Sequence, residues 1–338
     1  MMRYHCPSCR AEVYFGNDTC LSCGTELVFE PGRGFLDLRA EGLPACENRA
    51  RIGCNWVADA QEGAQGGLCL SCRHTTVIPD LSVEGNLQRW AEFEAAKRNL
   101  MRMAVLLDLP LTDSAGPRPR FLFKAPDAGE AVVMGHADGD ITLNIAEADD
   151  EYRAATRAEM GEPYRTLIGH LRHESGHAFW EVLVKPFPDR LAACRALFGD
   201  EREDYGQALE RHYAQPAPAG WEQAFVSEYA TAHPYEDFAE SWANLLHILD
   251  GLETALCYGL MPAGHELAAP EAPRDILFWL LGIAMEDLVS AWIALSLALN
   301  ALNDSLGHPS FYPFILTPKV SEKLDWVRQV IRQGCLAD

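Results

Sequence analysis

Two histidines and a glutamate in the middle of the chain form the motif His-Glu-x-x-His, made by His173, Glu174 and His177. Residues four apart share one face of a helix, so the two imidazoles can bind one zinc ion from the same side. Glu174 follows the first histidine and can reach a water molecule bound to that ion. The motif is short and arises by chance in unrelated chains. Its meaning therefore depends on a third ligand, a helical context, a substrate-holding strand and the compartment.

We expect a third ligand on a second helix downstream. Pro234 suits the first turn of a helix, and Glu236 and Glu240 then lie four residues apart on one face. One carboxylate can bind the metal while the other orients a histidine ligand through its free ring nitrogen. His233 and His247 are alternative ligands, but their positions are more typical of pocket or surface residues.

The helix that carries the motif is expected from about residue 164 to about residue 183, before Pro186. Gly176 lies inside it, and a helical glycine costs about 1 kcal/mol relative to alanine. Close packing near the metal site would explain why a glycine is tolerated there. His170, three residues before the motif, is interpreted as a residue of the surroundings or the surface rather than as a ligand.

Eight of the eleven cysteines lie before residue 73, which in a reducing compartment indicates metal binding rather than disulfides. The first four form two C-x-x-C pairs, and each pair can present two thiolates to one tetrahedral ion. The next four end in a third such pair. Zinc is favoured for both groups, and a rubredoxin-like iron site is an alternative for the first. The predicted ligands are Cys6, Cys9, Cys20 and Cys23 for one structural zinc, and Cys46, Cys54, Cys69 and Cys72 for another.

Some alternatives stay open for these cysteines. The two groups could interleave, some thiols could simply be buried, and His5 or His74 could replace a thiolate. Cys194, Cys257 and Cys335 belong to no motif and are interpreted as structural or incidental. Because residues 1–75 contain little apolar sequence, we expect this part to depend on its metals for folding.

The charge of the chain bears on its partners. The 338 residues carry a formal net charge of −21, which disfavours nucleic acid and anionic membranes. Residues 1–75 have no lysine, seven arginines and nine acidic residues, so their charge disfavours nucleic-acid binding by the ribbon and favours a protein partner. The start of the chain lacks an apolar signal segment, and the apolar stretch of residues 276–301 is interrupted by Glu286 and Asp287. We expect a cytoplasmic protein with no membrane contact, in which this stretch is a buried helix.

The remaining patterns predict helices around a few short strands. Residues 86–107 read as an amphipathic helix whose apolar face includes Leu87, Trp90 and Phe93. Strands are expected at residues 121–123, 131–134 and 141–145, with a hairpin turn at residues 135–140 in which His136 is a turn residue. The last strand is expected to edge a cleft and hold an extended peptide. Helices are expected at residues 239–249, 275–300 and 318–332.

The motif and the downstream carboxylates together resemble the gluzincin metallopeptidases. The arrangement of Tyr229 seven residues before Glu236 is similar to that of the anthrax lethal factor family. This resemblance implies that His173, His177 and Glu236 bind a catalytic zinc. It also implies that Glu240 contacts a metal ligand without binding the metal itself, and that Tyr229 assists at the reacting carbonyl.

The chain as a whole resembles bacterial zinc-binding metallopeptidases that carry an amino-terminal zinc ribbon. This resemblance spans most of the sequence and rests on the two cysteine groups, the His-Glu-x-x-His motif and the run from Glu236 to Glu240. It implies an α+β fold, in which a Cys-rich zinc ribbon precedes a mostly helical zincin-like domain with a small β-sheet. We place the ribbon at residues 1–75 and the zincin-like domain at residues 76–338.

The predicted function is zinc-dependent hydrolysis of a peptide, protein or other amide substrate, with Glu174 as general base. One catalytic and two structural zinc ions are expected. The alternative is a non-catalytic scaffold whose His-Glu-x-x-His site is structural or vestigial and whose ribbon contacts a protein partner. The metal content of a His173→Ala variant would distinguish the two, because the enzyme requires one more zinc than the cysteines hold.

Overall fold

The computed structural model describes residues 2–59, 67–114, 116–126, 132, 134–160, 164–270 and 276–334. The chain forms two compact units by its internal contacts. The first consists of residues 1–106 and 110–171, and the second of residues 107–109 and 172–338. The predicted boundary between residues 75 and 76 falls inside the first unit and stays a prediction.

The amino-terminal segment folds as two small antiparallel hairpins. Their strands are β1 (Tyr4–His5) with β2 (Glu12–Val13), and β3 (Leu27–Glu30) with β4 (Gly34–Asp37). Two single-turn helices follow, α1 (Arg49–Ile52) and α2 (Leu70–Arg73). The expectation that residues 1–75 offer little apolar sequence is wrong. Five buried aromatic rings form a core between the hairpins: Tyr4, Phe15, Phe29, Phe35 and Trp56.

Helix α3 (Asn86–Leu106) agrees with the predicted amphipathic helix, and α1 and α2 pack against it. Trp90 and Phe93 are buried as expected, but Leu87 is exposed. The buried face also contains charge, since Lys97 Nζ lies 2.9 Å from Glu94 Oε1 and both side chains are fully buried. This ion pair replaces part of the expected apolar stripe, and Glu94 Oε1 also accepts hydrogen bonds from the Trp90 indole and the Thr75 hydroxyl.

A four-stranded sheet belongs to the same unit, in the order β5 (Thr75–Val77), β8 (Arg120–Lys124), β10 (Asp140–Asn144) and β9 (Gly135–Ala137). The first three strands are parallel, and β9 runs antiparallel to β10. A further pair joins β6 (Thr112–Asp113) and β7 (Gly116–Pro117). The short η2 (Ile145–Ala148) and α4 (Asp150–Met160) follow.

Two predictions about this sheet are wrong. The strand expected at the edge, β10, lies between β8 and β9 and is not an edge strand. The predicted hairpin turn at residues 135–140 is shorter, because residues 135–137 form β9 and the turn itself consists of Asp138 and Gly139, both with positive φ angles. His136 does serve this turn, since its Nε2 accepts a hydrogen bond from the Gly139 amide. The strand predicted at residues 131–134 lies partly outside the described residues, and Val132 and Met134 are not in a strand.

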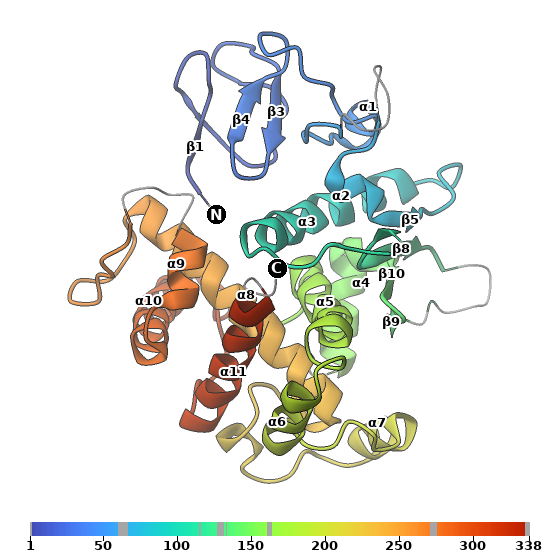
Figure 1. Cartoon of the computed structure of the whole chain (residues 1–338), viewed down its shortest axis with the longest axis vertical. Helices are drawn as coiled ribbons and strands as arrows, with labels where there is room; N and C mark the ends of the chain where they lie inside the picture. The colour runs from blue at the N-terminus through green and yellow to red at the C-terminus, as the bar shows by residue number, and fades with distance from the viewer. Residues whose placement is uncertain are drawn as a thin grey trace. The chain divides into compact units, whose positions relative to one another are not determined.

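Helices dominate the second unit. Helix α5 (Leu167–Leu183) carries the His-Glu-x-x-His motif and enters this unit at Arg172. Helix α8 (Pro234–Tyr258) is longer than predicted, and α6, α9, α10 and α11 pack against it (Figure 1). A buried ion pair of 2.6 Å joins Lys323 of α11 to Asp237 of α8. The other elements are α6 (Pro188–Phe198), α7 (Tyr205–Ala214), η3 (Trp221–Gln223), η4 (Tyr229–Thr231), α9 (Ile276–Gly282), α10 (Met285–Ser305) and α11 (Pro318–Gly334).

The apolar stretch predicted as one buried helix forms two helices, α9 and α10, separated at residues 283–284. Among the described residues, α10 alone is long and apolar enough to cross a membrane by length and composition, and 33% of its most apolar window is buried. Leu297 and Leu302 are exposed, so the expected full burial of this stretch is wrong. The fold class is α+β, with a Cys-rich ribbon followed by a mostly helical part with small sheets.

Candidate metal centre

The first half of the site comes from α5. His173 and His177 lie one turn apart on this helix, with their ring centroids 5.0 Å apart. Both face α8, because Gly176 between them allows close approach. A Cβ on Gly176 would lie 3.0 Å from the Ala239 Cα atom. The helix–helix contact thus explains the glycine that the sequence pattern singled out.

The second half comes from the first two turns of α8. His233 caps this helix, since its Nδ1 accepts a hydrogen bond from the Tyr235 amide, and Pro234 fills the first turn. Its other ring nitrogen, Nε2, lies 3.1 Å from the Glu203 carbonyl, so both ring nitrogens of His233 have protein partners. His247, the other alternative ligand, lies 2.6 Å from the Arg172 guanidinium. Neither histidine belongs to a metal-ligand cluster among the described residues.

Three of the predicted ligands converge. Glu236 Oε2 lies 2.9 Å from His173 Nε2 and 3.5 Å from His177 Nε2. One potential ligand atom from each of the three residues lies within 4.8 Å of the others. Glu236 and His177 are buried. Two imidazoles and a carboxylate are a donor set that zinc uses in catalytic sites, so these residues fit the ion.

Glu240 contacts the triad of His173, His177 and Glu236 through His173. Its Oε1 lies 2.7 Å from His173 Nδ1, the ring nitrogen on the side away from Glu236. Its Oε2 accepts a hydrogen bond of 2.6 Å from the Ser227 hydroxyl, which in turn accepts one from the Ala230 amide. A carboxylate at this position fixes the tautomer and orientation of a histidine ligand. Ser227 was not identified from the sequence, because it has no motif spacing relative to Glu240.

The electrostatics of the triad favour a bound cation. Burial by itself would lower the pKa of His173, but the adjacent carboxylates of Glu236 and Glu240 outweigh it and raise that pKa well above its usual value. Burial would likewise raise the pKa of Glu236, but His177 and His173 hold it well below its usual range. In the metal-free protein, the positive charge that these carboxylates stabilise is a proton. A divalent ion meets the same demand.

Glu174 lies beside the triad without binding it. Its Oε2 atom is buried and has no hydrogen-bond partner within the part of the chain that the structure describes. Burial raises the pKa of this carboxyl, although His173 and His177 act in the opposite direction. A buried carboxylate oxygen without a partner among the described residues is costly, and this one lies close to both motif histidines.

Three tyrosines surround these residues. The ring of Tyr229, in η4, lies 5.8 Å from that of His173, and burial raises its pKa well above the usual value, so its hydroxyl stays a donor. Tyr235 packs on His177 at 4.3 Å between ring centroids and donates to the His177 carbonyl. Tyr205, in α7, donates a hydrogen bond of 2.7 Å to Glu236 Oε1. No sequence motif assigned a role to Tyr205 or Tyr235, and α7 is not among the helices predicted from the sequence.

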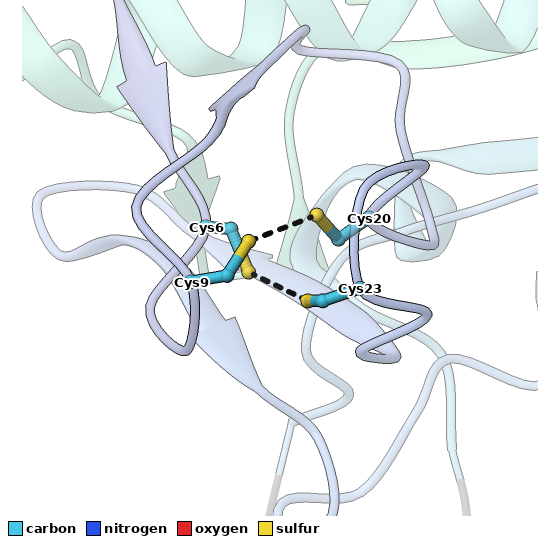
Figure 2. Close-up of side chains that lie close together, drawn as sticks. All are labelled: Cys6, Cys9, Cys20 and Cys23. Carbon is cyan, nitrogen blue, oxygen red and sulfur yellow. Dashed lines mark hydrogen bonds between the residues drawn. The ribbon is translucent and has the colours of Figure 1, made fainter.

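The first cysteine tetrad forms as predicted. Cys6, Cys9, Cys20 and Cys23 point toward one another from two facing loops (Figure 2). The Sγ atoms of Cys6 and Cys23 are 3.7 Å apart, as are those of Cys9 and Cys20. No disulfide links the described cysteines. Four thiols around one centre match a tetrahedral zinc site.

The second tetrad, Cys46, Cys54, Cys69 and Cys72, forms likewise, and all four cysteines are buried. The interleaved pairing considered above is therefore wrong, because each group closes on itself. His74 does not belong to this cluster, which consists of the four cysteines, and its Nδ1 lies 2.7 Å from the Pro119 carbonyl. Cys194 is buried and accepts a bond from Trp180 Nε1, Cys257 is half-buried, and Cys335 lies outside the described residues.

Comparisons with known proteins agree with this geometry. A zinc-ribbon domain family matches residues 3–83, and a family described as "Putative zinc-binding metallo-peptidase" matches residues 86–330. Uncharacterized proteins of Mycobacterium tuberculosis and Mycobacterium bovis are each 40% identical over 335 residues, which cover 98% of this chain and 95% of theirs. No solved structure matches significantly. The chain therefore belongs to this zinc-binding metallo-peptidase family and carries an amino-terminal zinc ribbon.

Proposed function

We propose that this protein is a gluzincin-like zinc hydrolase that cleaves a peptide or other amide bond. The observation that carries the proposal is the buried, unpartnered Oε2 atom of Glu174 beside the triad of His173, His177 and Glu236. A buried carboxylate oxygen without a partner is costly, and this one lies next to the three candidate ligands. Beside a catalytic metal it has a partner, which is the attacking water.

His173, His177 and Glu236 would hold the ion, and Glu240 would orient His173. Bound zinc lowers the pKa of a water molecule towards about 7 and polarises a carbonyl oxygen. Glu174 takes the proton of the attacking water and passes it to the leaving amine. Burial raises the pKa of the Glu174 carboxyl, which makes it a better proton acceptor for this role.

Tyr229 supplies the donor for the oxyanion that develops on the substrate. Its hydroxyl stays protonated because burial raises its pKa, with the charge of Glu236 acting in the same direction. One such donor contributes on the order of 3 kcal/mol to transition-state stabilisation.

The test is a Glu174→Gln variant, assayed on a peptide library by mass spectrometry. We expect turnover to fall by roughly 10²- to 10⁴-fold, because the proton acceptor is lost. Zinc content should not change, because Glu174 is not a ligand. Glu181→Gln is the matched control, since Glu181 lies on the same helix and pairs with Lys185.

Two outcomes would contradict the proposal. One is a Glu174→Gln protein that cleaves as fast as the unchanged chain. The other is a His173→Ala protein that keeps its full zinc content, which would leave the cysteine tetrads as the zinc sites and favour the scaffold function.

A further inference from the structure

Residues 199–204, between α6 and α7, contact the start of α8. Gly199 has a φ of 107°, and a Cβ there would lie 2.9 Å from the Pro234 Cγ atom. The Glu203 carbonyl lies 3.1 Å from His233 Nε2, whose Nδ1 is used by the helix cap. Both contacts are made to the two residues that begin α8. The segment is thereby fixed against the turn that presents Glu236.

The same segment is braced by its own ion pairs. Arg195 binds Glu201 at 2.5 Å, and Arg202 binds Asp200 at 2.6 Å. Asp204 then caps α7, with its carboxylate accepting a bond from the Gln207 amide. Individual exposed pairs contribute little to stability, but together with the cap they define where α7 begins. Tyr205 is the first residue of that helix, so its position is determined on both sides.

Tyr205 contacts the metal site directly. Its ring packs edge-on against His233, with centroids 5.2 Å apart, and its hydroxyl donates to Glu236 Oε1 at 2.7 Å. The two carboxylate oxygens of Glu236 therefore have different partners. Oε1 faces the tyrosine, while Oε2 faces His173 and His177.

We propose that Tyr205 is a positioning residue, whose hydroxyl engages one oxygen of Glu236 so that only the other is free for the metal. This inference rests on the proposed role of Glu236 as a zinc ligand. The hydrogen bond from Tyr205 holds the carboxylate with Oε2 directed at His173, so Glu236 would need little further ordering to bind zinc and would bind it more weakly without the tyrosine hydroxyl. Hydrogen-bond partners of this kind typically change metal affinity or activity by about 10–100-fold.

The experiment measures zinc affinity without a substrate. The full chain and its Tyr205→Phe variant are titrated with a chelator. The zinc ion that is missing from a His173→Ala variant is the ion whose affinity is compared. We expect its dissociation constant to rise about 10–100-fold in Tyr205→Phe. The zinc at the two cysteine tetrads should be unaffected. Phenylalanine keeps the ring that packs on His233, so the fold should be retained.

Tyr213→Phe is the matched control, because Tyr213 lies on the same helix and its side chain is 60% exposed. Its dissociation constant should stay close to that of the unchanged chain. The Glu236→Gln background distinguishes an effect of Tyr205→Phe that acts through Glu236 from a general structural effect of that variant. If Tyr205 acts through Glu236, adding Tyr205→Phe there should change the affinity little further.

The possible results separate this inference from the proposed function. Unchanged zinc affinity in Tyr205→Phe, or full additivity with Glu236→Gln, would overturn the inference while leaving hydrolysis by Glu174 intact. Weakened zinc in Tyr205→Phe with no effect of Glu174→Gln on cleavage would support the inference and contradict the hydrolase. A native chain without a third zinc would overturn both.

Discussion

At the scale of single residues, the site is defined by which partner each ring nitrogen and each carboxylate oxygen contacts. The two ring nitrogens of His173 face two different carboxylates, at 2.9 Å for Glu236 and 2.7 Å for Glu240. One contact suits a shared metal, and the other fixes the ring. Glu236 is divided in the same way between the histidines and Tyr205. Glu174 is the exception, because one of its oxygens has no partner among the described residues.

A buried histidine away from the triad gives a pH prediction. Burial lowers the pKa of His74 from 6.5 to about 4, and its Nδ1 is bound to the Pro119 carbonyl. The unfolded chain therefore binds this proton more tightly. The stabilisation by neutral His74 is complete above pH 6.5 and is lost as the pH falls through about 4. The shift corresponds to about 3 kcal/mol.

The measurement compares urea unfolding of the native chain and a His74→Gln variant across this range. Glutamine can still donate to the Pro119 carbonyl but does not titrate. The free energy of unfolding should fall with pH more steeply in the native chain than in the variant. Parallel curves would show that His74 does not contribute. The comparison cancels the loss of zinc from protonated thiolates, which both proteins share.

At the scale of elements, the approach of α5 to α8 decides whether the ligands meet. Gly176 has no side chain, and a Cβ there would lie 3.0 Å from Ala239 Cα and 3.1 Å from Trp242 Cβ. Trp242 also donates to the Ser175 hydroxyl and stacks on Phe179. The contact lies between the helical turns that carry His177 and Glu240, so any separation of the helices there is transmitted to the ligands.

Gly176→Ala should therefore be harmful despite the better helix propensity of alanine. Propensity favours the change by about 1 kcal/mol, but overpacking typically costs about 1–3 kcal/mol. We expect a net loss of stability and weaker binding of the triad zinc, measured by thermal unfolding and chelator titration. Gly206→Ala in α7 is the control, because its nearest neighbour is an ordinary contact at 3.5 Å. It should leave zinc affinity unchanged, and equal effects of both variants would contradict the packing argument.

At the scale of the whole molecule, the described residues form three candidate ligand clusters that differ in exposure. The second cysteine tetrad is entirely buried, whereas Cys9 and Cys23 of the first are exposed. The clusters also differ in chemistry, since four thiolates close a structural site while two histidines and a carboxylate leave a position open.

The order of zinc release should follow this exposure. In a His173→Ala background, which removes the triad ion, a chelator should release zinc in a fast and a slow phase, because it can reach the exposed thiolates first. A Cys9→Ser variant should abolish the fast phase and keep the slow one, as measured by a chromogenic zinc indicator. Loss of the slow phase instead would contradict the assignment.

Much of the site is local in sequence and was predicted from it. The spacing of His173 and His177, of Glu236 and Glu240, and of the C-x-x-C pairs is fixed by one helical turn or one tight turn. The helices at residues 86–107 and 318–332 were also predicted, because their apolar periodicity extends over several turns. The α+β class followed from the resemblance to a known family, whereas the expected edge position of β10 was wrong because strand order depends on long-range pairing.

The sequence by itself determined which side chains could hold metal and which pairs share a helical face. Only the tertiary structure decided that each cysteine group closes on itself, that His233 is a cap and that Glu174 Oε2 is left without a partner among the described residues. It alone brought Tyr205 to Glu236, 31 residues away, and Ser227 to Glu240. The physical reason is that these contacts depend on the path of residues 199–205 and of the loop before η4. Irregular backbone has no periodicity from which its partners could be predicted.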